Sequence, residues 1–214
     1  MRLVTAIIPA YNEEKTIGPI VATLRKTPLI KEVIVIDDGS EDETAKRALA
    51  EGAEVIRLPK NQGKGEALTE GVKRGQAEIL LFLDADLTGL TKEHIELLTM
   101  PVLEGSFDMT IGSVDRGRRL NQWISKFESP FAGVRVLKKD FWQEIPENFK
   151  KGYFIESALT YFARQKNLKT KGFILTGVKH IVKERKHGLW QGLVYRFKMM
   201  AEIALANFLL RIYF

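Results

Sequence analysis

Short apolar runs alternate with segments of helical pattern through the first half of this chain. The apolar runs occupy residues 3–8, 32–37, 54–58, 78–83 and 107–112. The helical segments between them occupy residues 16–26, 42–51, 65–74 and 91–103. Strict alternation of strand and helix requires right-handed crossovers and a mostly parallel sheet. The sequence therefore predicts an α/β fold, in which helices flank a mostly parallel sheet.

The second half of the chain is less regular. We expect a strand at 134–137, a helix at 155–165, an extended segment at 170–178 and a helical tail at 189–214. Neither a repeat nor a low-complexity linker separates these segments. The sequence therefore predicts one domain, residues 1–188, with residues 189–214 as a C-terminal helical extension.

Charge and cysteine content limit the classes of function. The formal net charge is +6, and residues 164–198 carry ten Lys or Arg against one acidic residue, Glu184. Such a segment favours phosphates, anionic lipid headgroups or nucleic acid, although a solvated basic surface is the simpler interpretation. Cysteine is absent, so a metal ion would be held by carboxylate, imidazole or carbonyl ligands. No signal segment is visible at the N-terminus, and we expect a cytoplasmic protein.

The strongest chemical signal is Asp84-Ala85-Asp86, which follows an apolar strand. Two carboxylates at positions i and i+2 beyond a strand end point to one side where the chain turns. They then reach one hard cation, and Mg²⁺ or Mn²⁺ suits such oxygen ligands. A polar turn without a metal is the alternative.

A second signal, Asp37-Asp38-Gly39-Ser40, also follows an apolar strand. The Asp38 carboxylate is suited to accept hydrogen bonds from a nucleobase or a ribose hydroxyl, and Gly39 allows close approach of backbone to a ligand. The alternative is a helix cap, in which Ser40 caps a helix with Glu43 at its third position. Ligands of parallel sheets bind beyond the carboxyl ends of the strands, where this motif lies.

Two further loops carry residues suited to a nucleotide. In the segment from Pro9 to Glu13, Tyr11 has a ring that stacks on a base and Glu13 has a carboxylate that accepts hydrogen bonds. In Asn61-Gln62-Gly63-Lys64-Gly65, glycines on both sides of Lys64 let its ammonium reach a phosphate. The spacing is not that of a Walker loop.

Together these motifs resemble the family 2 type of nucleotide-sugar glycosyltransferases, which have the GT-A fold. The matching text is IIPAYNEEKTIG, VIVIDDGSEDET, NQGKGEAL and LFLDADL, in that order. The resemblance is strong over residues 3–112 and looser beyond them. It includes enzymes that make glucosyl-3-phosphoglycerate and dolichol-phosphate mannose synthases. The resemblance implies a nucleotide-binding half, residues 1–113, and an acceptor-binding half, residues 114–188.

The resemblance also implies roles for individual residues. The residues expected to bind the nucleotide sugar are Pro9, Ala10, Tyr11, Glu13, Asp38, Gly63, Lys64, Asp84 and Ala85. Asp86 would be the more direct ligand of a Mg²⁺ or Mn²⁺ ion and the main catalytic carboxylate. The ion would neutralise charge that develops on the departing nucleoside diphosphate.

Three residues of the second half receive roles from the same resemblance. His180 would complete the metal site, with His187 as its competitor. Glu156 would face the acceptor and take its proton, or it would only stabilise a helix N-terminus; Ser157 follows it where many relatives carry Asp. Gly133 and Arg135 would bind the acceptor, Arg135 as a bidentate donor to an anion, unless Arg135 is a surface residue.

The tail at 189–214 has an apolar stripe interrupted by charges, so we do not expect it to span a membrane. We expect it to pack on the sheet or to form a homodimer. A peripheral contact of this basic helix with an anionic membrane is the alternative. Stacking of its aromatic residues on nucleic acid is the least favoured interpretation, and we expect no nucleic-acid partner.

The sequence thus predicts a metal-dependent glycosyltransferase that moves a sugar from a UDP- or GDP-linked donor to an anionic acceptor such as a phosphoglycerate. One alternative is transfer to a polyprenyl phosphate at a membrane. A sugar-phosphate nucleotidyltransferase would carry an early basic glycine-rich loop, and here that loop is acidic. A non-catalytic nucleotide-binding module would not need both Asp84 and Asp86.

Overall fold

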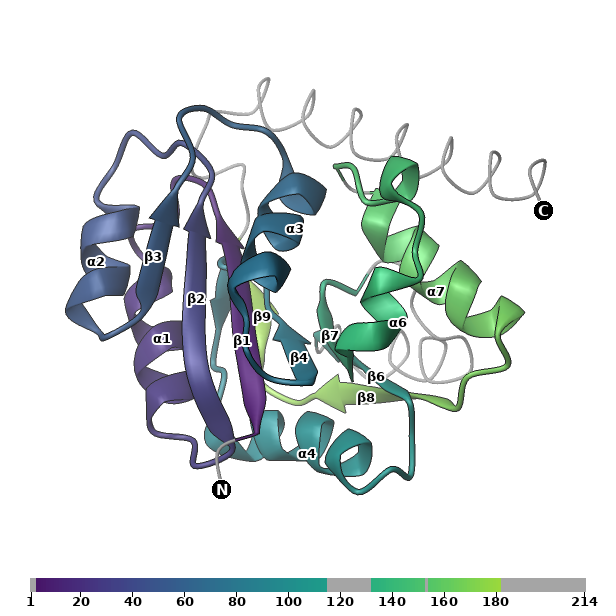
Figure 1. Cartoon of the computed structure of the whole chain (residues 1–214). Helices are drawn as coiled ribbons and strands as arrows, with labels where there is room; N and C mark the ends of the chain where they lie inside the picture. Colours follow the sequence, from purple (N-terminus) through teal and green to yellow (C-terminus); the bar gives the residue numbers. More distant parts are fainter. Residues whose placement is uncertain (1–2, 115–131, 153, 182–214) are drawn as a thin grey trace.

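The computed structural model describes residues 3–114, 132–152 and 154–181, and a seven-stranded sheet lies at its centre (Figure 1). The strand order is β3 (Glu54–Arg57), β2 (Ile30–Asp37), β1 (Val4–Ala10), β4 (Ile79–Phe82), β7 (Val134–Lys138), β6 (Met109–Val114) and β8 (Thr170–Leu175). Neighbouring strands run parallel, except that β7 is antiparallel to both β4 and β6. The predicted mostly parallel sheet is therefore confirmed.

Helices cover both faces of the sheet (Figure 1). The helices whose buried residues join the first core cluster are α1 (Ile17–Arg25), α2 (Thr44–Ala50) and α4 (Lys92–Leu103). Those on the opposite face are α3 (Lys64–Arg74), α6 (Lys139–Gln143) and α7 (Phe154–Gln165), with the short 3-10 helix η1 (Glu147–Phe149). α4 continues through Pro101 to its end at Leu103.

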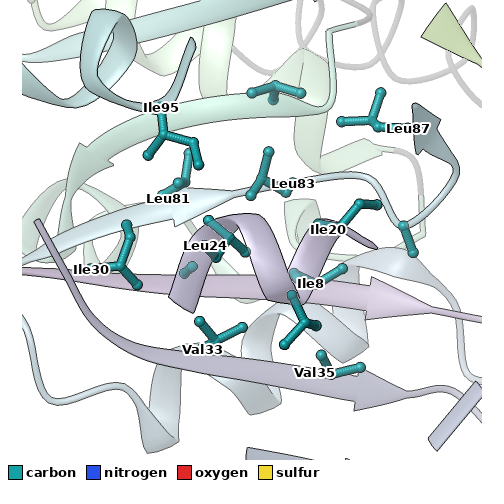
Figure 2. Packing of buried hydrophobic residues seen from close by; sticks show 14 of the residues in the cluster. Ile8, Ile20, Leu24, Ile30, Val33, Val35, Leu81, Leu83, Leu87 and Ile95 are labelled. Carbon is teal, nitrogen blue, oxygen red and sulfur yellow. The ribbon is translucent and has the colours of Figure 1, made fainter. Parts of the chain in front are cut away.

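Alternation of side chains along the strands explains the two layers. Ile8 of β1 and Val35 of β2 pack with Leu24 of α1 on one face of the sheet (Figure 2). Ile7 of β1 and Phe82 of β4 belong to the cluster on the other face. Because successive strand residues point to opposite faces, an apolar run buries side chains in both layers.

A second, two-stranded sheet lies beside the carboxyl end of β4. It pairs β5 (Leu87–Thr88) with β9 (Lys179–His180) in antiparallel register, with Leu87 opposite His180. Two-residue strands carry no periodic signal, so the sequence pattern does not predict them. This pairing brings the segment around residue 180 back to the Asp84-Ala85-Asp86 turn.

Several expectations fall outside the described residues. They concern His187 and the helical tail at 189–214, with its predicted dimer and membrane contacts. Within the described ranges, no helix is both long enough and apolar enough to cross a membrane.

Candidate active site

Three candidate metal ligands meet at the carboxyl edge of the sheet. Asp84, Asp86 and His180 each offer one ligand atom, and these atoms lie within 4.8 Å of one another. The methyl group of Ala85, 4% exposed, belongs to the hydrophobic core. Since Ala85 is held in the core, the aspartates on either side of it emerge from the strand end, as the pattern predicts.

His180 reaches this cluster through backbone pairing. The Ile181 amide donates to the Asp86 carbonyl at 2.9 Å, next to the β5–β9 pair. The His180 Nδ1 atom lies 2.8 Å from Asp86 Oδ1. Burial opposes the charged imidazolium, but the hydrogen bond to Asp86 and the charge of Asp84 outweigh it and raise the pKa of His180.

The Lys64 ammonium joins the two halves of the site. Its Nζ atom lies 2.5 Å from Asp84 Oδ1 and 2.6 Å from Glu156 Oε1. The three side chains are only 10–17% exposed. Desolvation would lower the pKa of Lys64, but the two carboxylates more than compensate and raise it. Lys64 is therefore a charged bridge from the start of α3 to the turn after β4 and the first turn of α7.

The Asp38 carboxylate holds the loop that precedes Lys64. This carboxylate accepts hydrogen bonds from the backbone amides of Gln62 at 2.7 Å and Gly63 at 2.8 Å. Asp38 is 4% exposed. Burial raises the pKa of Asp38, although the two amide donors act in the opposite direction. Both carboxylate oxygens thus bind the loop, and recognition of a base by Asp38 stays a prediction.

The loop after β1 contains exposed and buried candidates. Pro9 and Ala10 end the strand, and Tyr11 is 37% exposed beyond it. Glu13 is 7% exposed, and its Oε2 atom accepts the Thr16 hydroxyl at 3.1 Å. Tyr11 is thus available for stacking, while the buried Glu13 carboxylate already accepts a bond from its own loop.

Ser40 does not cap α2, since the residue before this helix is Glu43. The Ser40 hydroxyl instead accepts a hydrogen bond from the Asn12 amide at 2.9 Å. This bond ties the loop after β1 to the loop after β2. The alternative of a cap by Ser40 is wrong.

Arg135 lies inside the protein. It is 1% exposed, its Nε donates to the Ala132 carbonyl at 3.0 Å, and one terminal nitrogen donates to Thr160 Oγ1, also at 3.0 Å. The alternative of a surface arginine is therefore wrong. These contacts favour a structural role, and binding of an anionic acceptor by Arg135 stays a prediction.

Gly133 leaves room for Asp84. A Cβ atom at position 133 would lie 2.2 Å from Asp84 Oδ2, closer than any van der Waals contact permits. The glycine therefore permits the position of this carboxylate, whether or not it also contacts an acceptor.

The sequence pattern indicated no role for two charged residues near the site, Arg57 and Glu66. The Nε atom of Arg57 in β3 lies 3.4 Å from Asp37 Oδ2. A terminal nitrogen of the same guanidinium donates a hydrogen bond to the Ser40 carbonyl at 2.5 Å. Glu66 of α3 accepts the Gly152 amide at 3.1 Å. The only hint in the sequence was their closeness to the glycine-bearing loops.

The donor set fits a hard divalent cation. Carboxylate oxygens suit Mg²⁺ and Mn²⁺, and a neutral imidazole nitrogen is a common metal ligand in proteins. Beside these candidate ligands, the Lys64 ammonium and the backbone of the loop at 61–65 are suited to bind a phosphate group. A mostly parallel α/β sheet with a candidate metal site at its carboxyl edge is the arrangement expected of a GT-A glycosyltransferase.

The chain belongs to glycosyl transferase family 2, whose family model matches residues 5–188. An uncharacterized protein of Methanocaldococcus jannaschii is 32% identical over 197 residues, which cover 86% of this chain and 76% of that protein. Glucosyl-3-phosphoglycerate synthase of Mycolicibacterium smegmatis is 37% identical over 111 residues, or 48% of this chain. That match spans only 37% of the synthase.

Solved structures agree with this assignment of the fold. The Mycobacterium tuberculosis glucosyl-3-phosphoglycerate synthase, in complex with Mn²⁺, UDP and glucosyl-3-phosphoglycerate, has a TM-score of 0.73 at 25% identity. The similarity covers 84% of this chain and 72% of the synthase chain. The GT-A fold expected from the sequence is therefore confirmed.

Proposed function

We propose that this chain transfers a sugar from a nucleoside-diphosphate donor, UDP- or GDP-linked, to an anionic acceptor of the phosphoglycerate type. The observation that carries the proposal is the meeting of Asp84, Asp86 and His180 within 4.8 Å at the sheet edge. The similar synthase binds UDP, Mn²⁺ and a glucosylated phosphoglycerate, which supports both the donor class and the acceptor class.

Asp86 and His180 would hold a Mg²⁺ or Mn²⁺ ion, with Asp84 beside them. The bound ion would supply positive charge next to the diphosphate leaving group. Lys64 adds a fixed ammonium at the same place, and its low exposure strengthens its attraction for phosphate oxygens. Tyr11 would stack on the base at the end of β1, where its ring is exposed.

On the acceptor side, Glu156 would orient a hydroxyl group and receive its proton. Its Oε1 atom accepts a hydrogen bond from Lys64, which holds the carboxylate toward the donor half. The basic segment follows Glu156 in the sequence, and its part at 164–181 contains five Lys or Arg and no acidic residue. That charge favours an anionic acceptor over a neutral one.

A donor screen by thermal shift tests the nucleotide. With Mn²⁺ present, the matching nucleoside diphosphate at a hundred times its dissociation constant should stabilise the chain by roughly 2.7 kcal/mol. Asp86→Ala should abolish this shift, whereas Asp140→Ala, an exposed aspartate of α6, should preserve it. The absence of a shift with every nucleotide would contradict the proposal.

A transfer assay then tests the acceptor. The matching donor sugar, Mn²⁺ and 3-phosphoglycerate should yield a glycosylated phosphoglycerate, and chelation by EDTA should stop the reaction. Product formed only with a polyprenyl phosphate would favour the membrane alternative. Nucleotide binding without transfer to either acceptor would favour a non-catalytic module.

A further inference from the structure

The two halves of the proposed site touch at the start of α3. A Cβ atom on Gly65 would lie 2.0 Å from the Lys150 carbonyl oxygen, and one on Gly63 would lie 3.6 Å from the Gly152 Cα atom. The backbone of α3 therefore lies directly against the segment that leads into α7. Glu156, the acceptor-facing carboxylate, follows in the first turn of that helix.

The N-terminus of α3 is unusual, because Glu66, the glutamate in its first turn, does not form a capping box with the N-cap residue. Gly63 is the N-cap residue and Glu66 stands three positions later, where a glutamate commonly accepts the amide of the N-cap residue. Here the Gly63 amide donates to Asp38 at 2.8 Å. The Glu66 carboxylate instead accepts the amide of Gly152, which is 86 residues later in the chain, at 3.1 Å.

The partner of Glu66 is a backbone group at a turn. Gly152 has a φ of 49°, in the left-handed region that favours glycine, and the chain enters α7 two residues later. A hydrogen bond that this amide donates to a charged acceptor is stronger than one that it donates to a neutral acceptor. It fixes the direction in which the chain enters α7, and so the place of Glu156 relative to Lys64.

We propose that Glu66 is a positioning residue that sets the acceptor-facing helix α7 against the nucleotide-binding loop. Lys64 contacts Glu156 directly, whereas Glu66 acts through the backbone at Gly152. The Glu66 contact does not use the Asp84–Asp86–His180 cluster, so it holds α7 whatever occupies that cluster. The kinetic consequence of this inference rests on the proposed function, but its structural consequence does not.

Amide exchange in the ligand-free chain of 214 residues tests the structural consequence. Glu66→Ala should speed exchange of the Gly152 amide about tenfold, because the charged acceptor is lost. Glu66→Gln keeps an acceptor oxygen and should restore most of the protection. Glu70→Ala is the matched control, since Glu70 lies one turn further along α3 and pairs with Lys73 and Arg74 of the same helix. Unchanged Gly152 exchange in Glu66→Ala would overturn the proposal.

Steady-state kinetics test the functional consequence. Glu66→Ala should raise KM for the acceptor about tenfold, which corresponds to a loss of roughly 1.4 kcal/mol of binding free energy. The affinity for nucleotide and Mn²⁺ should stay unchanged. Rescue by Glu66→Gln is expected, because an amide oxygen also accepts the Gly152 bond. An equal loss of donor and acceptor affinity would overturn the positioning role. If the unmodified chain shows no transfer at all, the proposed function fails, and the exchange experiment still tests the link to Gly152.

Discussion

The His180 imidazole lies 2.8 Å from Asp86 Oδ1, although 94 residues separate the two along the chain. This places a candidate nitrogen ligand from the second half of the chain beside two candidate oxygen ligands from the first half. The candidate cation site therefore depends on both halves of the chain, and the contribution of each half can be tested by replacing its own candidate ligand.

We expect His180→Ala to weaken Mn²⁺ binding at least about tenfold, because one of the two proposed protein ligands is removed. Titration calorimetry with Mn²⁺ in the presence of the matching nucleotide measures the change. His187→Ala is the comparator, since His187 was the competing candidate in the sequence. Equal losses in both variants would remove the assignment of His180 as the ligand.

We expect Lys64→Met to destabilise the metal-free chain by about 2 kcal/mol, less than the loss of a fully buried pair, because these side chains are partly exposed. The substitution leaves Asp84 and Glu156 close together without their shared cation. Urea denaturation measures the change, and Mn²⁺ should reduce it by supplying positive charge near Asp84. Lys46→Met, at an exposed surface pair, is the control and should change stability by less than about 0.5 kcal/mol.

The two roles considered for Arg135 predict different results. If Arg135 is structural, Arg135→Met should cost about 2–4 kcal/mol of stability, because Thr160 and the Ala132 carbonyl lose their donor inside the protein. Denaturant unfolding compares it with Arg47→Met, an exposed arginine of α2. Unchanged stability together with a raised KM for the acceptor would instead support the acceptor-binding role.

Gly65 tests the close contact between the two halves. Gly65→Ala should destabilise the chain by about 1–3 kcal/mol, because its methyl group overlaps the Lys150 carbonyl. Gly18→Ala in α1 has its nearest atom at 3.8 Å and should stabilise the chain by roughly 0.5–1 kcal/mol through helix propensity. Thermal unfolding of both variants measures the contrast. A stable Gly65→Ala protein would show that the segment at 150–152 moves away easily.

The sequence predicted the strands and helices of the first half because their apolar periodicity is long and each strand ends in polar residues. The same logic placed Asp38, Asp84 and Asp86 at one edge of the sheet, where the structure has them. It could not give the direction of β7, since an apolar strand has the same pattern in either direction. It also could not give β5 and β9, which are two residues long each.

Arg135 shows why burial is hard to predict for single charged residues. Charged side chains are almost never fully buried unless they are paired. The sequence gives no sign that the partners of Arg135 lie at Ala132 and Thr160, because only the packing of α7 against the sheet brings Thr160 close. Glu66 was missed for the same reason, since its partner is a backbone amide far along the chain.

The pairing of Leu87 with His180 makes the position of one candidate metal ligand depend on strand register. Successive residues of a strand face opposite sides, so a slip of one residue would turn the imidazole away from Asp86. One residue inserted between β8 and β9 would then place Lys179 where His180 now stands. The spacing of this short connection thus matters as much to the candidate cation site as the side chains that form it.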